Sequence, residues 1–196
     1  QKVLEPLLQK NNLEATHEHL NRLNWEAEEV LPLVLNLLTI RAVASRGRHQ
    51  DPMRLLYASV CKYSGLNPVD IEGSSKILWP LHRARSVKLT AQWGEQLEGY
   101  AARFAQHYWL HELFPKHPSL NAYMCRLLLL GAVHRLLLVN HPEIAKYLDA
   151  DTEVPKEVLE QTAIRVVSKV TRNMEHNVMI NEVLKALSSS GSFPSS

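Results

Sequence analysis

Apolar residues recur at intervals of three and four along most of the chain, which is the spacing of α-helices that bury one face. Runs in which β-branched and polar residues alternate are scarce, so the pattern gives little support for strands. The sequence therefore predicts an all-α fold, a multi-helix bundle. We expect a single helical domain over residues 1–187, followed by a flexible tail rich in Ser over residues 188–196.

Capping signals place the helices of the first half, after an amphipathic segment at the start of the chain. Leu31–Ala44 is predicted as an apolar helix. Its early Pro32 is compatible with this prediction only in the first turn, where proline is tolerated. Asp51 followed by Pro52 is typical of a helix start. Gly65 suits the left-handed residue that ends a helix, so a second helix is predicted between these two signals.

The second half contains one segment that is difficult to interpret. In residues 71–87, the run Gly73-Ser74-Ser75 and the later Pro80 interrupt short apolar pieces, so a loop with a short helix is predicted there. A long helix is predicted over residues 88–113. The last helix is predicted to begin near residue 155 and to end near residue 187.

The segment Leu120–Val139 is apolar around nearly its whole circumference, which favours a central helix covered on all sides. It nevertheless contains Arg126, His134 and Arg135, and buried cations require partners. These cations also interrupt the apolar run well short of the roughly 20 apolar residues that a membrane span needs. We therefore expect a core helix and no membrane partner.

Residues placed 100° apart along the last predicted helix separate into an apolar half and a polar half. The apolar half contains Val166, Val167, Val170, Thr171, Met174 and Val178. The other half contains a basic stripe, which is Arg165, Lys169, Arg172 and His176. We expect this stripe to face solvent, with a missing domain or a partner as the alternatives.

Two polar residues at the end of this helix lie where apolar ones are expected. Glu175 falls at the edge of the apolar half, and Asn177 falls inside it. Since the central helix offers Arg126, His134 and Arg135, the sequence predicts a polar lock, which we define as contacts between these three cations and the Glu175/Asn177 pair. It is interpreted mainly as a buried ion pair that fixes the helix register. The alternative is a polar pocket for a ligand carboxylate or a substrate amine.

The long predicted helix contains two histidines and an aromatic stripe. His107 and His111 share one face, a spacing at which two imidazoles can bind one metal, but no third ligand is fixed, so no metal site is predicted. The stripe of Tyr100, Phe104 and Tyr108 is typical of a core, with a pocket for a lysine side chain as the alternative. The candidate substrate-facing residues are Tyr100, Tyr108, His107, His111 and His176.

Composition and motifs exclude several classes of function. The chain is 45% hydrophobic and 21% charged, and its net charge of +2 is too small to favour a nucleic-acid partner. Cys61 and Cys125 are isolated within apolar patterns, so buried thiols in a reducing compartment are expected. Serine nucleophile elbows, phosphate-binding glycine loops and dinucleotide fingerprints do not occur, and catalytic residues stay unassigned. The start at Gln1, without Met or a signal peptide, suggests part of a longer protein.

Several short motifs together resemble the C-terminal part of the flagellin lysine N-methylase family. They are His111-Glu112-Leu113-Phe114-Pro115, Tyr123, the run LLLLGAVHRLLL at residues 127–138, Val167-Ser168-Lys169-Val170 and Glu175-His176-Asn177. The similarity covers residues 99–177 and is weaker over residues 1–90.

This resemblance implies a protein-lysine N-methyltransferase that uses S-adenosylmethionine and modifies flagellin in the bacterial cytoplasm before export. The family also has an N-terminal part rich in closely spaced cysteines, which implies an iron-sulfur cluster there. Cys61 and Cys125 cannot form such a site, so the catalytic apparatus of this chain alone is expected to be incomplete. The second hypothesis is a non-catalytic helical interaction or ligand-binding module, similar to the ligand-binding bundles of bacterial regulators.

Overall fold

The computed structural model describes residues 28–44, 51–111 and 120–174, and all regular structure in these ranges is helical, as predicted. A short 3-10 helix, η1 (Glu28–Val30), precedes the α-helices. These are α2 (Leu31–Ala44), α3 (Pro52–Ser64), α4 (Ile71–His111), α5 (Leu120–Val139), α6 (Pro142–Asp149) and α7 (Lys156–Met174). The prediction of an all-α multi-helix bundle is confirmed.

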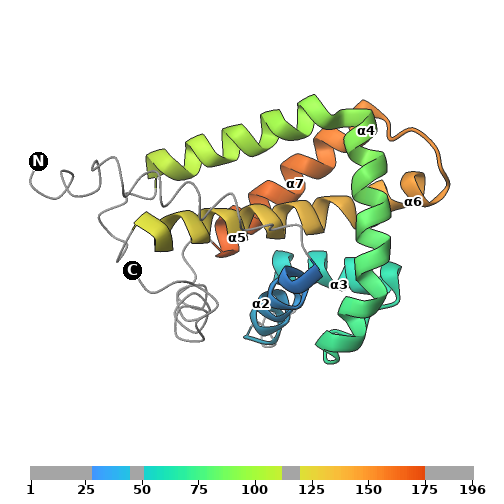
Figure 1. The fold of residues 1–196 in the computed structure, drawn as a ribbon, viewed down its shortest axis with the longest axis horizontal. Coiled ribbons are helices and arrows are strands. Elements are labelled where there is room, and N and C mark those ends of the chain that lie inside the picture. Colours follow the sequence, from blue (N-terminus) through green and yellow to red (C-terminus); the bar gives the residue numbers. More distant parts are fainter. Residues whose placement is uncertain (1–27, 45–50, 112–119, 175–196) are drawn as a thin grey trace, which may run out of the picture.

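The central helix is α5, with the bounds predicted from the sequence. Helices α2, α3, α4, α6 and α7 all pack against it. In Figure 1, α2 and α3 lie on one side of α5, while α4 rises on the right of the view, with α6 beyond it, and then runs across the top. Leu129, Leu130, Val133 and Leu137 of α5 are fully buried, so this helix forms the middle of the core.

The capping signals of the first half act as predicted. Asp51 has an extended backbone, and its carboxylate accepts hydrogen bonds of 3.0 Å from the backbone N–H groups of Met53 and Arg54. Gly65 ends α3 with a left-handed φ of 68°, and its N–H donates to the carbonyl of Cys61. Arg41 of α2 adds an ion pair to Asp51 at 2.9 Å, so this cap also joins α2 to α3.

The prediction of a loop with a short helix over residues 71–87 is wrong, because α4 is helical from Ile71 onward. Asp70 caps its first turn by accepting from the N–H of Gly73 at 2.9 Å. The hydroxyl of Ser75 donates to the carbonyl of Ile71, so this serine is satisfied inside the helix. Burial of one face stabilises the helix over this segment, because Leu78, His82, Arg85 and Leu89 are buried at helical spacing.

The helix predicted over residues 88–113 belongs to this longer element, which bends, and its last two residues lie outside the described ones. Trp93 interrupts α4 with non-helical angles of φ −136° and ψ 28°. We call residues 71–92 the first arm of α4 and residues 94–111 the second arm. The two arms run in different directions, and the second arm passes over α5 and α7 (Figure 1).

The loop between α6 and α7 holds this bend. The indole N–H of Trp93 donates to the carbonyl of Val154 at 3.0 Å. The side-chain oxygen of Gln92 accepts from the N–H of Val154 at 3.0 Å. Because the bend is fixed by backbone groups of this loop, the second arm is directed back across the bundle.

The last helix begins close to the predicted position, and its apolar half is the buried one. Leu159, Ala163, Val166, Val170 and Met174 are buried, while Val167 and Thr171 lie half-buried at the edge of this face. Arg165 and Arg172 of the basic stripe are exposed, and Lys169 is half-buried. The predicted amphipathic start, the end of the last helix and the tail lie outside the described residues.

Both cysteines, Cys61 and Cys125, are buried free thiols, as predicted. Among the described residues, no single helix is long and apolar enough to cross a membrane. Tyr123–Val139 and Pro142–Asp149, which are bent by 61° to each other, together have the length and apolar composition of a broken membrane span. Buried core helices also have these properties.

Two glycines predict opposite effects of the same substitution. Gly65→Ala should lower the free energy of unfolding by about 1 kcal/mol, because an L-residue is strained at its φ of 68°. Gly131→Ala should raise it by about 0.5–1 kcal/mol, because the helical backbone suits alanine and an added Cβ meets nothing within 4 Å. Urea denaturation of both variants measures the difference, and effects of equal sign would contradict this explanation.

Candidate functional site

A cavity of about 380 Å³, which we call the inner cavity, lies between the second arm of α4, α5 and α7. The second arm contributes Leu97, Tyr100, Ala101, Phe104 and Ala105. Helix α5 contributes Leu127, Leu128, Gly131, Ala132, His134, Arg135, Leu138 and Val139, and α7 contributes Ala163, Val166 and Val167. His82 of the first arm completes the lining.

Small residues leave this space open between helices that otherwise pack closely. Gly131 has no side chain to fill it, and Ala132 and Ala163 extend only one carbon from α5 and α7. The lining is therefore mostly aliphatic and aromatic carbon, as in sites that bind small apolar molecules.

His134 is a polar group of the inner cavity. Its ring meets that of Phe104 edge to face, with a centroid distance of 4.3 Å and an angle of 82° between the planes. Burial lowers the pKa of His134 to about 3, so the imidazole is neutral near pH 7. Its Nε2 atom is buried without a hydrogen-bond partner among the described residues.

A second hollow, of about 660 Å³, adjoins the inner cavity, and we call it the outer hollow. The two share Tyr100, Phe104, Ala163 and Val167. The other residues of the outer hollow are mostly polar, and they are Arg103, His107, Glu160, Ile164, Ser168, Thr171 and Arg172. The inner cavity is mostly apolar, with Arg135 as its charged residue, whereas the outer hollow has three charged residues, Arg103, Glu160 and Arg172.

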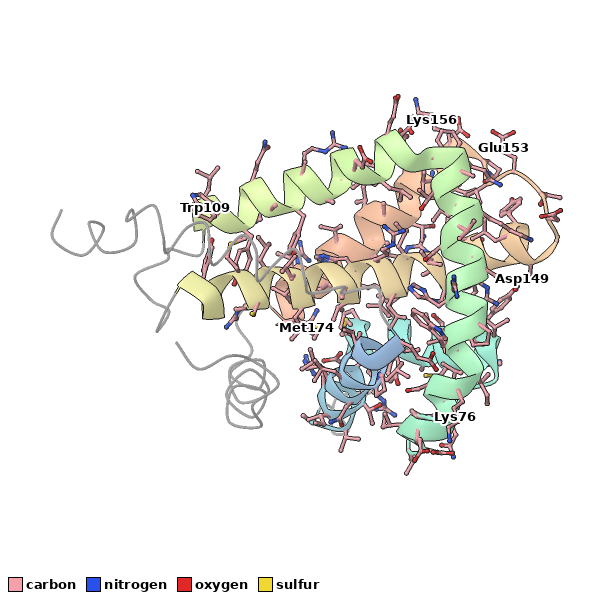
Figure 2. The ribbon with its side chains drawn as sticks, in the orientation of Figure 1. Lys76, Trp109, Asp149, Glu153, Lys156 and Met174 are labelled. Carbon is pink, nitrogen blue, oxygen red and sulfur yellow. The ribbon has the colours of Figure 1, made fainter. Side chains whose placement is uncertain are left out.

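A buried polar network holds the first arm of α4 against α3, α5 and α6. Its centre is Arg85, whose side chain is 4% exposed and which donates to both carboxylate oxygens of Asp149, at 2.8 and 2.7 Å. Arg85 also donates to Asn140 at 2.9 Å and to Ser64 at 3.3 Å. Asp149 lies at the end of α6, beside the first arm (Figure 2).

The same network reaches the inner cavity through His82. The amide of Asn140 lies 2.9 Å from Nδ1 of His82 and also donates to the carbonyl of Leu136 at 2.9 Å. Burial, and then the charges of Arg135 and Arg85, lower the pKa of His82 to about 4. A neutral His82 accepts the hydrogen bond from Asn140, so this residue of the cavity lining is held in place.

The predicted polar lock is only partly within the described residues. Arg126 is buried, and Arg135 lines the inner cavity and donates to the hydroxyl of Thr90 at 3.2 Å. His134 lines the same cavity, so two of the three predicted cation positions meet there. Glu175, Asn177 and His176 lie outside the described residues, and the lock stays a prediction.

The candidate substrate-facing residues separate into different environments. Tyr100 lines both hollows, and His107 lines the outer one. Tyr108 is fully buried and packs against Tyr123, with ring centroids 5.3 Å apart, so it lies in the core. The side chain of His111 lies outside the described residues. Within the described ranges, no three His, Cys, Asp or Glu side chains come together as a metal site would require.

Sequence reasoning missed the polar network of Arg85, Asp149, Asn140 and His82. Because a loop with a short helix is predicted over residues 71–87, the prediction does not place Arg85 on a helix face. The available signal was the spacing of Leu78, His82, Arg85 and Leu89, which puts two polar residues on an apolar face.

Comparisons of the chain with protein-family models, with curated proteins and with solved structures found no match. The described helices and the inner cavity define an all-α bundle with a mostly apolar cavity. The resemblance to the methylase family stays a prediction.

The two histidines beside the cavity predict a loss of stability in mild acid. The pKa values of His82 and His134 are about 4 and about 3 when folded, below the ordinary value of about 6.5 in an unfolded chain. The unfolded state therefore binds more protons as the pH falls, so the free energy of unfolding should decrease from about pH 6.5 to about pH 4. Urea denaturation at several pH values measures this slope. In His134→Leu the slope should be shallower, and an unchanged slope would contradict the assignment.

Two neighbouring aspartates test the value of the Arg85 network. Asp149→Asn should lower the free energy of unfolding by about 1–3 kcal/mol, since it leaves the buried Arg85 guanidinium without its carboxylate, although partial exposure of Asp149 screens the effect. Asp151 pairs with Lys88 at 2.8 Å on the surface, and Asp151→Asn should have little effect. Equal losses in the two variants, measured by urea denaturation, would show that burial of Arg85 is unimportant.

Proposed function

We propose that this chain is the C-terminal helical domain of a protein-lysine N-methyltransferase that methylates flagellin with S-adenosylmethionine. The observation that supports it is the way the resembling segments assemble. All residues that line the inner cavity, except His82 and Leu97, lie within residues 99–177, where the resemblance is clear. The segments of the motifs on α5 and α7 thus form one structural unit with the second arm of α4.

In this proposal the domain supports a catalytic part that lies in a more N-terminal region of the protein. The buried thiols of Cys61 and Cys125 are unsuited to hold an iron-sulfur cluster, because burial raises the pKa of both and they are not close in sequence. The proposed partners are flagellin and the protein's own N-terminal domain, and the proposed compartment is the cytoplasm.

Methyl transfer tests the proposal directly. The protein made from the complete gene should transfer labelled methyl groups from S-adenosylmethionine to lysines of flagellin, whereas the 196-residue chain alone should not. Flagellin whose surface lysines are replaced by arginine is the control substrate, and labelling of it should be lost. No methyl transfer by the folded complete protein would contradict the proposal. Full activity of the 196-residue chain alone would contradict the placement of the catalytic part in a more N-terminal region.

The inner cavity also favours a second candidate, a helical module that binds a small ligand and has no catalytic role. An apolar cavity of about 380 Å³ between three helices lies in the size range of small-molecule sites, roughly 300–1,000 Å³. The two candidates are separated by the same assay, because a ligand-binding module transfers no methyl group.

A further inference from the structure

The inner cavity and the outer hollow together form an amphipathic site. They meet at Tyr100 and Phe104 of α4 and at Ala163 and Val167 of α7. The inner cavity is mostly aliphatic and aromatic, with polar side chains at His82, His134 and Arg135, and the outer hollow contains Arg103 and Arg172. A ligand that occupies both can therefore place an apolar part in the inner cavity and an anionic part beside Arg103 and Arg172.

The inner cavity suits an unbranched hydrocarbon better than a polar molecule. Gly131, Ala132 and Val166 offer no hydrogen-bonding side chains, and the imidazole of His134 is neutral and packed against Phe104. Two further polar side chains of the lining have hydrogen bonds within the protein, since His82 accepts from Asn140 and Arg135 donates to Thr90. A nucleoside would lose hydrogen bonds to water here without replacing them, which is costly. The methyl donor is therefore a poor fit for this cavity.

The outer hollow has the charge that an anionic group requires. Arg103 lies over the ring of Tyr100 at 5.2 Å, and neither Arg103 nor Arg172 has an ion pair with a described residue. Glu160 adds one negative charge to this hollow against the two arginines, and it lies 3.9 Å from Lys156 on the surface. The hydroxyl of Thr171 is buried beside them without a hydrogen-bond partner among the described residues.

We propose that the two hollows form one binding site for an anionic single-chain amphiphile, with its aliphatic chain in the inner cavity and its carboxylate in the outer hollow against Arg103 and Arg172. Guanidinium groups bind carboxylates through charge-assisted hydrogen bonds. They repel the ammonium group of a lysine side chain, so the aromatic residues at this site serve a fatty-acid-like ligand. The inference does not depend on methyl transfer.

Titration calorimetry of the 196-residue chain with three probes of equal chain length tests the proposal. The probes are dodecanoate, dodecanol and dodecyltrimethylammonium, each below its critical micelle concentration. Dodecanoate should bind with one molecule per chain, dodecanol about tenfold more weakly and the cationic probe more weakly still. Absence of dodecanoate binding to the folded chain, or equal affinity for dodecanol, would overturn it.

Variants locate the two ends of the ligand separately. Arg103→Gln and Arg172→Gln together should weaken dodecanoate about tenfold and leave dodecanol unchanged. The matched control is Arg165→Gln, because Arg165 is exposed on the same helix but lines neither hollow. An equal effect of the control would show that general surface charge attracts the probe, which contradicts a built site.

Gly131→Phe should fill the inner cavity and abolish binding of both dodecanoate and dodecanol. Circular dichroism and urea denaturation establish that each variant is folded. Retained binding in a folded Gly131→Phe variant would overturn the placement of the chain. If this variant does not fold, the arginine variants and their control decide the proposal by themselves.

Discussion

The structure is organised around the need to cover a helix that has no polar face. Helix α5 is apolar on all sides, and five other α-helices pack against it. Burying that much apolar surface is the main favourable term in folding a bundle of this size. It also explains why α4 bends, since only a helix that changes direction at Trp93 covers both the end of α5 and its long side. The inner cavity lies where small residues leave this cover incomplete.

Buried charges fix the helices that apolar packing alone would leave free to slide. The Arg85 guanidinium has specific partners on α3 and α6 and just beyond the end of α5, and Arg41 joins Asp51 to Asn173 at the end of α7. Met174, the last described residue of α7, lies close to α2 in Figure 2, in agreement with this contact. A shift of one helix would leave a buried cation unpaired, so these contacts select one register.

Sequence reasoning succeeded where the structure depends on local signals. The cap at Asp51, the left-handed Gly65 and the start of α7 near Pro155 follow from residues within one turn of each other. It failed over residues 71–87, where Gly73 and Pro80 look like breaks but burial of one face keeps the helix intact. The inner cavity could not be predicted, because its lining comes from three helices whose relative placement depends on the bend at Trp93.

The second arm of α4 is supported near both of its ends. Leu97 and Tyr100 pack on one apolar cluster, with Leu138 and Ala163, whereas Phe104 and Tyr108 belong to the other cluster, with Tyr123 and Leu130. Ala101, between these supports, and Ala105, one residue beyond Phe104, line the inner cavity without belonging to either cluster. Related proteins could therefore vary these two alanines and acquire a different ligand preference, because the supports that hold the arm would be unaffected.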